Sequence, residues 1–241
     1  MPPPSVAAFQ LPKAGHRSEE CEDAFALDPE RGRFALSDGA SESFAAGDWA
    51  RRLSAGFVAE AGPWSRWLQQ ARADWAAQFH LRELSWYAET KLQEGAWATL
   101  LGVTFGGDEE SGTWTAMAVG DSCLFHVRED GLLRAFPMRR AGDFNNQPAL
   151  IGSIRASRRV HRLRLKGTYQ RGDRFFLMTD ALAAWFLQQY ENKERPWTRL
   201  ASLASPSDFE EFIAALRTGN AIRNDDVTLL CIGIPPREEH S

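Results

Sequence analysis

Short apolar runs that end in an acidic residue recur along the chain. Phe34-Ala35-Leu36 is followed by Ser37-Asp38-Gly39, and residues 175–178 are followed by Thr179-Asp180. Apolar runs of this length suit buried strands, and an acidic residue after each run places a carboxylate at the end of the strand. An Asp-Gly pair is also a common turn, so a plain turn stays open as the alternative for Asp38-Gly39 taken alone.

The first forty residues favour β structure. Phe9–Leu11 fits an edge strand, while Asp23–Leu27 and Arg33–Leu36 flank a turn at residues 28–32, so we expect a hairpin. Antiparallel pairing then places Glu22-Asp23 and Asp38 at the same end of the sheet.

From residue 43 the apolar period becomes helical. Apolar residues recur every four positions from Ala45 to Phe57 and, after the break at Gly62-Pro63, from Trp64 as far as Leu92. We expect these helices to pack on a flat surface through large rings. The Trp residues of this region are Trp49, Trp64, Trp67, Trp75 and Trp86.

Alternating residues then predict an antiparallel meander, with the strong turn signal Asp130-Gly131 before its last strand. Its four strands are Thr99–Phe105, Thr113–Val119, Cys123–Arg128 and Leu132–Phe136. Residues 138–158 form a long loop. Its basic residues suggest either a substrate-selecting border of a functional site or a solvated face. They are Arg139, Arg140, Arg155 and Arg158, with Arg159 beside them.

The last third of the chain predicts strands and helices in turn. Strands are expected at Arg159–Leu165, Arg174–Thr179 and Val227–Ile234, and helices at Ala181–Tyr190, Pro196–Ala204 and Ser207–Leu216, the last with Ser207 as N-cap. We find no linker and no repeat. The pattern therefore predicts a single domain over residues 1–241, an α+β layered sandwich.

Composition narrows the class of protein. The 241 residues are 44% hydrophobic and 25% charged, with a net charge of −4, which argues against nucleic-acid binding and against an anionic membrane partner. No apolar run approaches the ~20 residues of a membrane helix, and the N-terminus does not read as a signal peptide. Cys21, Cys123 and Cys231 have no C-x-x-C spacing and suit a reducing cytoplasm, so we expect a cytoplasmic protein.

The candidate chemistry lies in the acidic residues at the strand ends. Carboxylates that converge within a few ångströms repel one another strongly unless cations lie between them. Oxygen ligands without His or Cys favour Mg²⁺ or Mn²⁺, and two such ions support phosphoryl transfer. The residues concerned are Glu22, Asp23, Asp38, Asp121, Asp180, Asp225 and Asp226.

In order and spacing these motifs resemble the metal-dependent protein phosphatase 2C family. The matching segments are Glu22-Asp23-Ala24-Phe25, Leu36–Gly39, Gly120-Asp121-Ser122, Met178-Thr179-Asp180 and Asp225–Thr228. The resemblance implies a four-layer sandwich of two antiparallel sheets flanked by helices. The chain departs from the family pattern at Ala40, at Ala181 and at Ser18. With these departures the chain resembles a divergent bacterial member of the family.

The resemblance also implies a role for each residue. Asp38 would bridge two Mn²⁺ or Mg²⁺ ions, with the Gly39 carbonyl on one of them. Asp180 and Asp225 would complete the first ion's ligands, and Glu22, with Asp23 beside it, would reach the second. Asp121 resembles the ligand of a weaker third ion. The nucleophile would be a metal-bound water.

The implied activity is hydrolysis of phosphoserine and phosphothreonine in a phosphorylated protein, with a partner Ser/Thr kinase as a further expectation. Arg17 is one residue away from the family's phosphate-binding Arg, so its expected contribution to phosphate binding is weak. The alternative is a regulatory module that keeps the fold with little or no turnover. A cysteine phosphatase is excluded, because Pro235 and Pro236 deprive the C-x₅-R segment from Cys231 of N–H donors.

Overall fold

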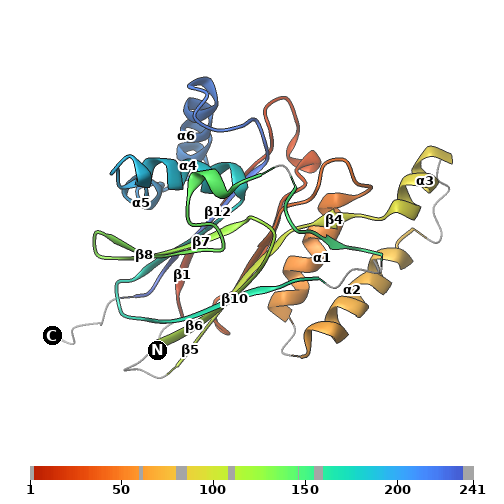
Figure 1. Ribbon diagram of the computed structural model, residues 1–241, viewed down its shortest axis with the longest axis horizontal. Coiled ribbons are helices and arrows are strands. Elements are labelled where there is room, and N and C mark those ends of the chain that lie inside the picture. Colours follow the sequence, from red (N-terminus) through yellow and green to blue (C-terminus); the bar gives the residue numbers. More distant parts are fainter. Residues whose placement is uncertain are drawn as a thin grey trace.

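In the computed structural model, two five-stranded antiparallel sheets pack face to face and helices cover both outer faces (Figure 1). The structure describes residues 3–59, 62–79, 86–107, 112–145, 147–154 and 160–235. The predicted α+β fold with four layers is confirmed. Three apolar layers hold it together: one between the sheets and one between each sheet and its helices.

The first sheet, sheet A, has the strand order β1-β12-β11-β7-β8. Its strands are β1 (Ser5–Leu11), β12 (Val227–Gly233), β11 (Arg174–Met178), β7 (Cys123–Arg128) and β8 (Gly131–Phe136). β1 lies at the edge, as expected of Phe9–Leu11. The central strands β11 and β12 are mostly apolar because both of their faces are buried over most of their length.

The second sheet, sheet B, has the order β10-β6-β5-β3-β2. Its strands are β10 (Leu163–Tyr169), β6 (Gly112–Val119), β5 (Leu100–Gly107), β3 (Arg33–Ser37) and β2 (Ala24–Asp28). The predicted hairpin is confirmed, since β2 and β3 pair antiparallel with Ala24 opposite Ser37. Asp23 and Asp38 therefore leave the sheet at the same end.

The predicted meander is wrong in one respect: its four strands do not share a sheet. β5 and β6 belong to sheet B, whereas β7 and β8 belong to sheet A. The chain crosses between the sheets at Gly120, whose φ of +103° suits glycine, and a Cβ there would lie 2.5 Å from the Thr99 side chain. The alternation of apolar and polar residues cannot reveal the crossing. A strand shows the same alternation whether it pairs with the preceding strand or joins the other sheet.

Helices α1 (Ala46–Ala59) and α2 (Trp64–Ala77) cover the outer face of sheet B, where the Trp49 and Trp75 rings meet edge to face. On sheet A lie α4 (Asp180–Glu191), α5 (Pro196–Ala201) and α6 (Pro206–Thr218), and Phe125 of β7 stacks on Phe186 of α4. Among the described helices, none has the length and apolar character needed to cross a bilayer.

Three details of the helix prediction need correction. The stripe from Trp64 to Leu92 is not one helix, because α2 ends at Ala77 and α3 (Trp86–Glu94) is separate. Trp86 does not pack in the helical layer, since it is 78% exposed at the start of α3. The N-cap of α6 is Ser205 rather than Ser207, and its Oγ accepts the Asp208 N–H at 3.1 Å. Pro206 then occupies the first turn, where its missing N–H costs nothing.

The long loop after β8 links the two helical layers. Its first part contains η2 (Ala141–Asp143), which packs on α4, and its second part contains β9 (Ile151–Gly152), which pairs with β4 (Trp97–Ala98). The second part passes close to Gly120, since a Cβ there would lie 3.0 Å from the Ala149 oxygen. This supports the expectation that the loop borders the acidic residues.

Two basic residues of the loop, Arg139 and Arg140, do not lie where we expected them. Arg139 and Arg140 line a pocket with Tyr190 and Glu191 at the C-terminal end of α4, whereas the acidic residue Asp180 starts that helix. The helix separates the two ends by about 15–18 Å. Arg155, Arg158 and Arg159 lie outside the described residues.

Candidate metal centre

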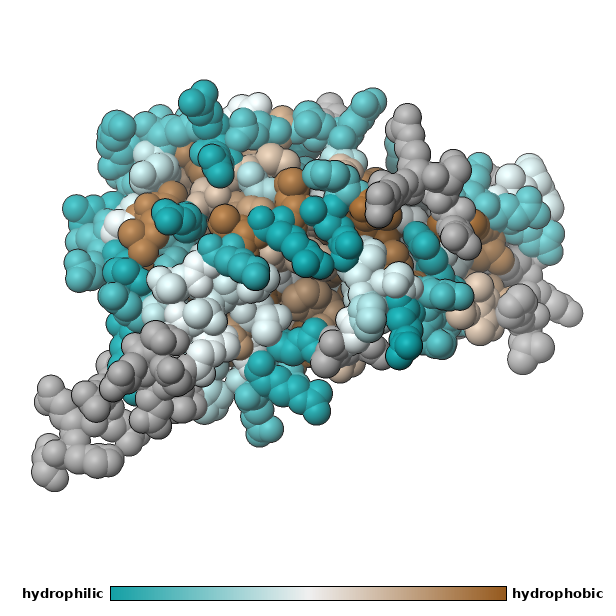
Figure 2. All heavy atoms as spheres, turned by 60° about the horizontal axis from the view of Figure 1, so that its bottom comes forward, coloured by the Kyte–Doolittle hydropathy of each residue, from teal (hydrophilic) through white to brown (hydrophobic). Residues whose placement is uncertain are grey.

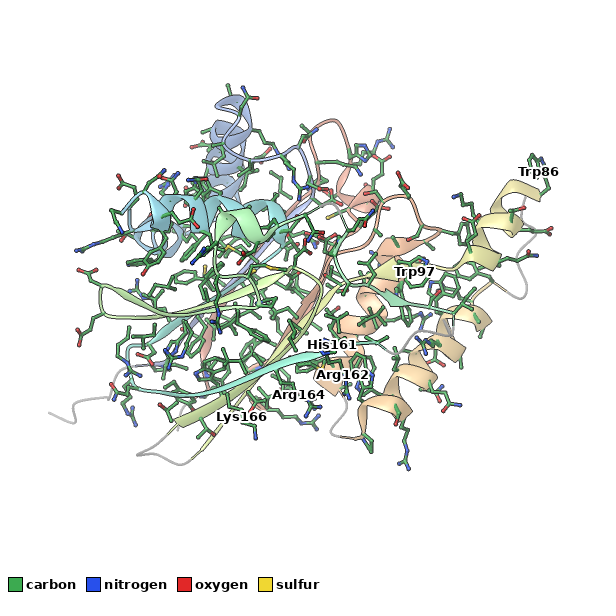
Figure 3. The ribbon with its side chains drawn as sticks, in the orientation of Figure 1. Trp86, Trp97, His161, Arg162, Arg164 and Lys166 are labelled. Carbon is green, nitrogen blue, oxygen red and sulfur yellow. The ribbon has the colours of Figure 1, made fainter. Side chains whose placement is uncertain are left out.

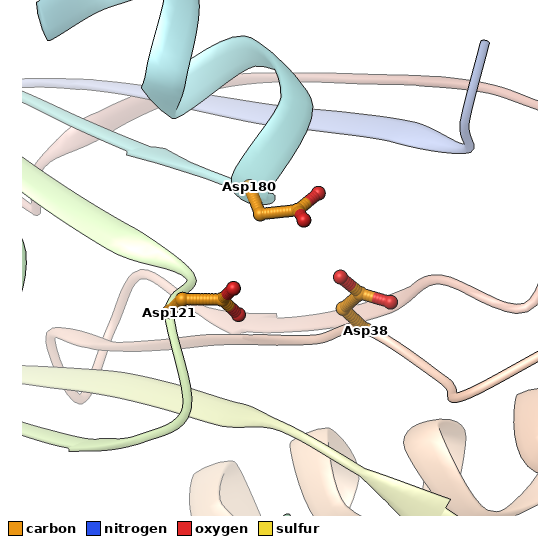
Figure 4. A group of neighbouring side chains, drawn as sticks. All are labelled: Asp38, Asp121 and Asp180. Atoms are coloured by element: carbon orange, nitrogen blue, oxygen red, sulfur yellow. The ribbon is translucent and has the colours of Figure 1, made fainter. Parts of the chain in front are cut away.

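Three aspartates from separate segments meet where strands of both sheets end. Asp38 follows β3, Asp121 lies in the connection between β6 and β7, and Asp180 is the first residue of α4 after β11. One carboxylate oxygen from each lies within 4.8 Å of those of the other two. Asp121 and Asp180 are buried and Asp38 is partly exposed. Figure 4 shows the three side chains converging on one space.

Hydroxyl groups fix the positions of Asp38 and Asp121 relative to each other. The Asp38 backbone N–H donates to Thr99 Oγ1 at 3.0 Å, and the Thr99 backbone N–H donates to the Asp38 backbone carbonyl at 2.8 Å. Thr99 Oγ1 also shares a hydrogen bond of 2.9 Å with Ser122 Oγ, next to Asp121. Thr99 and Ser122 are both buried, so these bonds are shielded from water and order the two segments.

Asp23 fixes the segment that carries Asp180. Its Oδ2 accepts hydrogen bonds from the Thr179 and Thr228 hydroxyls, at 3.0 and 2.8 Å. Thr179 Oγ1 in turn accepts the Thr228 N–H at 3.0 Å. Asp180 then sits at the N-terminus of α4, where the helix dipole favours a carboxylate. Ala181 is buried in the first turn of this helix, a position that alanine suits because it is small and favours helix.

Glu22 and Gly39 lie in direct contact. A Cβ on Gly39 would come within 2.7 Å of the Glu22 backbone oxygen, so only glycine permits this approach. The Glu22 N–H donates to Asp226 Oδ2 at 2.7 Å, and Asp226 Oδ1 accepts the Lys13 N–H at the same distance. Asp226 thereby ties the N-terminal segment to the start of β12.

The side chain of Glu22 has an unsatisfied oxygen. Within the described part of the chain, its Oε2 is buried without a hydrogen bond and forms an ion pair with Lys13 Nζ at 3.6 Å. Asp121 Oδ1 is likewise buried without a hydrogen bond from any described residue. A buried carboxylate oxygen without a hydrogen bond is costly, and a bound cation lowers that cost.

The pKa values of the clustered carboxyls report this crowding. Burial raises the pKa of Asp38 well above its usual range, and the charges of Asp23, Asp180 and Asp121 raise it further. Burial and the charge of Asp180 raise the pKa of Asp121 to about 7. Burial also raises the pKa of Asp180, against the lowering effect of Arg223. Without cations the cluster therefore binds protons, as expected of a site built for positive charge.

Arg223 supplies a cation to the cluster. Its Nη2 donates a hydrogen bond to Asp180 Oδ2, and its charge opposes the rise in the pKa of Asp121. The Arg223 side chain is 53% exposed, so the guanidinium lies at the solvent side of the cluster.

The residues present fit divalent metal ions. The donor set consists of carboxylates without a nearby His ligand, which is the set that Mg²⁺ and Mn²⁺ prefer. Two buried carboxylate oxygens without a hydrogen bond from any described residue and the raised pKa values of three aspartates show a deficit of positive charge. Asp38, Asp121 and Asp180 are the residues best placed to hold such ions, with Glu22 and the Gly39 carbonyl beside them.

The remaining expected ligands lie near this group but outside it. Asp225 raises the pKa of Asp38, Asp121 and Asp180 through its charge, and its Oδ1 accepts the Asp226 N–H at 3.0 Å. Asp121, expected as the ligand of a weaker third ion, lies in the tight group with Asp38 and Asp180. Asp23 lies behind the group, bound to two threonine hydroxyls.

Arg17 has a local role in the structure. Its N–H donates to Glu20 Oε2 at 2.7 Å at the start of η1 (Ser18–Glu20). Within the described part of the chain, no hydrogen bond or ion pair joins its guanidinium to the acidic cluster.

The sequence interpretation missed Arg223, Thr99 and Ser122. Arg223 stands two residues before Asp225, and Ser122 directly follows Asp121, so nearness to an acidic motif was the only available signal. Thr99 gave no signal, because its role depends on segments that are distant in sequence.

Comparisons with known proteins identify the family and the fold of the chain. The family model for protein phosphatase 2C matches residues 13–219, which include all three clustered aspartates but not Asp225. No curated protein sequence matches the chain significantly.

Solved structures share the fold over nearly their full length. The *Mycobacterium tuberculosis* serine/threonine phosphatase PstP/Ppp superposes with a TM-score of 0.65 at 16% identity, covering 97% of this chain and 100% of that one. The catalytic domain of PstP in complex with two manganese ions gives 0.62 at 17% identity, covering 97% and 99%. The phosphatase Stp1 from Staphylococcus aureus gives 0.60 at 16% identity, covering 97% and 96%. The match to the family model over most of its length shows that the chain belongs to the protein phosphatase 2C family.

Proposed function

We propose that the chain is a Mn²⁺- or Mg²⁺-dependent phosphatase that removes phosphate from serine and threonine residues of a phosphorylated protein. The observation that carries the proposal is the convergence of Asp38, Asp121 and Asp180, with oxygens within 4.8 Å of one another. The structural neighbour PstP binds two manganese ions, which supports the same metals here.

In this proposal Asp38, Asp180 and Asp225 hold the metals, together with Glu22 and the Gly39 carbonyl. Asp121 and Asp23 take the weaker positions, Asp121 for a third ion. Divalent ions bound there would neutralise the phosphate and lower the pKa of a coordinated water so that it attacks phosphorus.

The protein's own contribution is to fix the ligands before the substrate arrives. Thr99 holds the backbone of Asp38, and Asp23 holds Thr179 next to Asp180. Arg223 forms an ion pair with Asp180, and Lys13 forms one with Glu22. Their charges would attract a phosphate dianion and orient its oxygens.

The wider expectations belong to the same proposal. The chain would act as a single domain in the cytoplasm, on a phosphorylated protein and opposite a Ser/Thr kinase. The structural neighbours support a protein substrate, since they are named serine/threonine phosphatases.

The test is release of phosphate from a phosphothreonine peptide with Mn²⁺, with Mg²⁺ and with EDTA. We expect turnover with either ion, none with EDTA, and a loss of at least a hundredfold in Asp38→Asn. Glu30→Gln removes an exposed acid of the β2–β3 turn and is the matched control, expected to act as wild type. Turnover that survives EDTA, or an Asp38→Asn variant as active as wild type, would refute the proposal.

A regulatory module without turnover is the second candidate. The observation that favours it is the placement of Arg17, whose hydrogen bonds within the described chain join it to Glu20 of η1, so an arginine at the cluster is not supplied by this position. The same assay separates the two candidates: Mn²⁺ binding by calorimetry without phosphate release would identify the module.

A further inference from the structure

Three cations lie in a row along the outer edge of sheet B. Arg162 precedes β10, and Arg164 and Lys166 follow at alternate positions, so all three lie on the same side of the strand. Figure 3 shows them in sequence along β10. Successive members of the row are about 7 Å apart, the spacing of alternate residues in a strand.

This side of the sheet faces solvent. Alternation places Leu165, which packs in the apolar layer between the sheets, on the opposite side of β10 from Arg164 and Lys166. Both cations are exposed. Across the sheet, Lys166 stands opposite Thr115 of β6, which stands opposite Thr104 of β5.

The Phe57 ring of helix α1 packs against Gly102 of β5, and a Cβ at Gly102 would meet the ring at 2.5 Å. Beyond this point Thr104 and Thr115 are partly exposed and Thr113 is exposed. Seen from this side, a broad area of residues of intermediate hydropathy is bordered by strongly hydrophilic side chains (Figure 2).

In the described strands next to the row, no acidic residue balances the charges of Arg164 and Lys166. The described strands β5, β6 and β10 contain no Asp or Glu, although the chain as a whole is acidic. Within the described part of the chain, Arg164 and Lys166 have no ion pair. Arg162 is engaged differently, since its guanidinium lies 4.9 Å from the centre of the Trp64 ring.

The edge of β10 also offers backbone groups. β10 pairs with β6 on one side only, and it is the last strand of its sheet. Its outward N–H and C=O groups can pair with another extended chain. An added strand would place alternate side chains about 5 Å from Arg164 and Lys166, the distance of directly opposed residues.

We propose that this edge binds an extended acidic segment of a partner protein, whose backbone pairs with β10 and whose carboxylates lie opposite Arg164 and Lys166. Complementary charge selects the occupant: Arg164 and Lys166 stand at alternate positions on one side of a strand that contains no acid, so alternating Asp or Glu residues fit it. Charged residues on an edge strand can also serve only to prevent pairing with other chains, and the test separates the two roles.

The test uses a fluorescent peptide of about eight residues, a strand's length, in which Thr and Glu alternate. Its binding to the whole chain is followed by anisotropy in EDTA, so the outcome does not depend on phosphatase activity. We expect binding by the wild type, at least tenfold weaker binding of the same peptide with Gln for Glu, and at least tenfold weaker binding by the Arg164→Glu/Lys166→Glu variant.

The matched control is Arg134→Glu, an exposed cation on β8, the edge strand of sheet A. It should bind the acidic peptide as wild type does. Amide hydrogen exchange of the wild type gives a second measurement that needs no variant, and the acidic peptide should protect β10 but not β8.

Three results would overturn the proposal. The first is equal binding of the Glu and Gln peptides, or equal losses in the β10 and β8 variants. The second is no peptide binding together with self-association of the double variant, which would show that the cations only block pairing. The third is displacement of the peptide by an oligothymidylate at lower concentration than by unlabelled peptide, which would identify a nucleic-acid surface.

Discussion

The guanidinium of Arg223 donates a hydrogen bond to the carboxylate of Asp180, and so a side chain supplies positive charge to a cluster otherwise made of acids. The contact joins the loop before β12 to the first residue of α4. It lowers the pKa of Asp180 against the effect of burial. Arg223 therefore occupies one side of the space in which we propose that metals bind.

Replacement of Arg223 by Ala should strengthen metal binding and weaken the metal-free fold. The guanidinium competes with a metal ion for Asp180, so its removal should lower the dissociation constant for Mn²⁺ about threefold to tenfold, roughly 1 kcal/mol. The same change removes the counter-charge and should lower the melting temperature in EDTA. Calorimetric titration with Mn²⁺ and thermal unfolding measure the two effects. Weaker Mn²⁺ binding in Arg223→Ala would show that Arg223 assists the metals instead.

Arg195→Ala serves as the control for this experiment. Arg195 forms an ion pair with Asp130 at 2.6 Å on the surface, away from the cluster, and both side chains are exposed. Exposed ion pairs contribute little to stability. The variant should therefore match wild type in Mn²⁺ affinity and in melting temperature.

The stability of the metal-free protein should fall as the pH rises from about 4 through about 7. The pKa of Asp121 is about 7 in the folded chain, against an ordinary value of 3.8, so the folded state holds a proton that the unfolded state releases. Asp121→Asn removes this titration and should melt higher than wild type above pH 7, by about 10 °C. The two should converge below about pH 4. Thermal unfolding in EDTA across this range is the measurement, and a difference that does not change with pH would contradict the assignment.

Thr99→Val should loosen the site. Valine keeps the shape but leaves the Asp38 N–H and the Ser122 hydroxyl without their buried partner, which costs about 1–3 kcal/mol. Thr113→Val, at an exposed position of β6, is the control and should change stability little. We expect a lower melting temperature for Thr99→Val and weaker Mn²⁺ binding. A variant with unchanged Mn²⁺ affinity would show that the hydroxyl does not position Asp38.

Much of the fold follows from local pattern. β3 and β11 could be predicted because each is a short apolar run that ends at an acid, and α1 because its apolar residues recur every four positions. The change of sheet at Gly120 could not be predicted, since it depends on which strands pair rather than on any local period. The N-cap of α6 was misplaced by two residues, because Ser205 and Ser207 both flank a helical pattern.

The candidate site was only partly visible in the sequence. Asp38 and Asp180 could be predicted because each is an acid at the end of a strand. Asp121 could be predicted because it lies between two expected strands. Their distances, and the tight position of Asp121, are set by the packing of sheet A on sheet B. Arg223 and Thr99 belong to the site only through contacts between distant segments, and no local pattern marks such contacts.

The claim on which this account depends is that the clustered carboxylates bind divalent metal. Anomalous diffraction from a crystal of the protein grown with Mn²⁺ tests it most directly. We predict two strong peaks about 3.5–4 Å apart, with Asp38 between them and Asp180 within coordination distance of one. Peaks elsewhere on the protein with none at Asp38 would contradict the account.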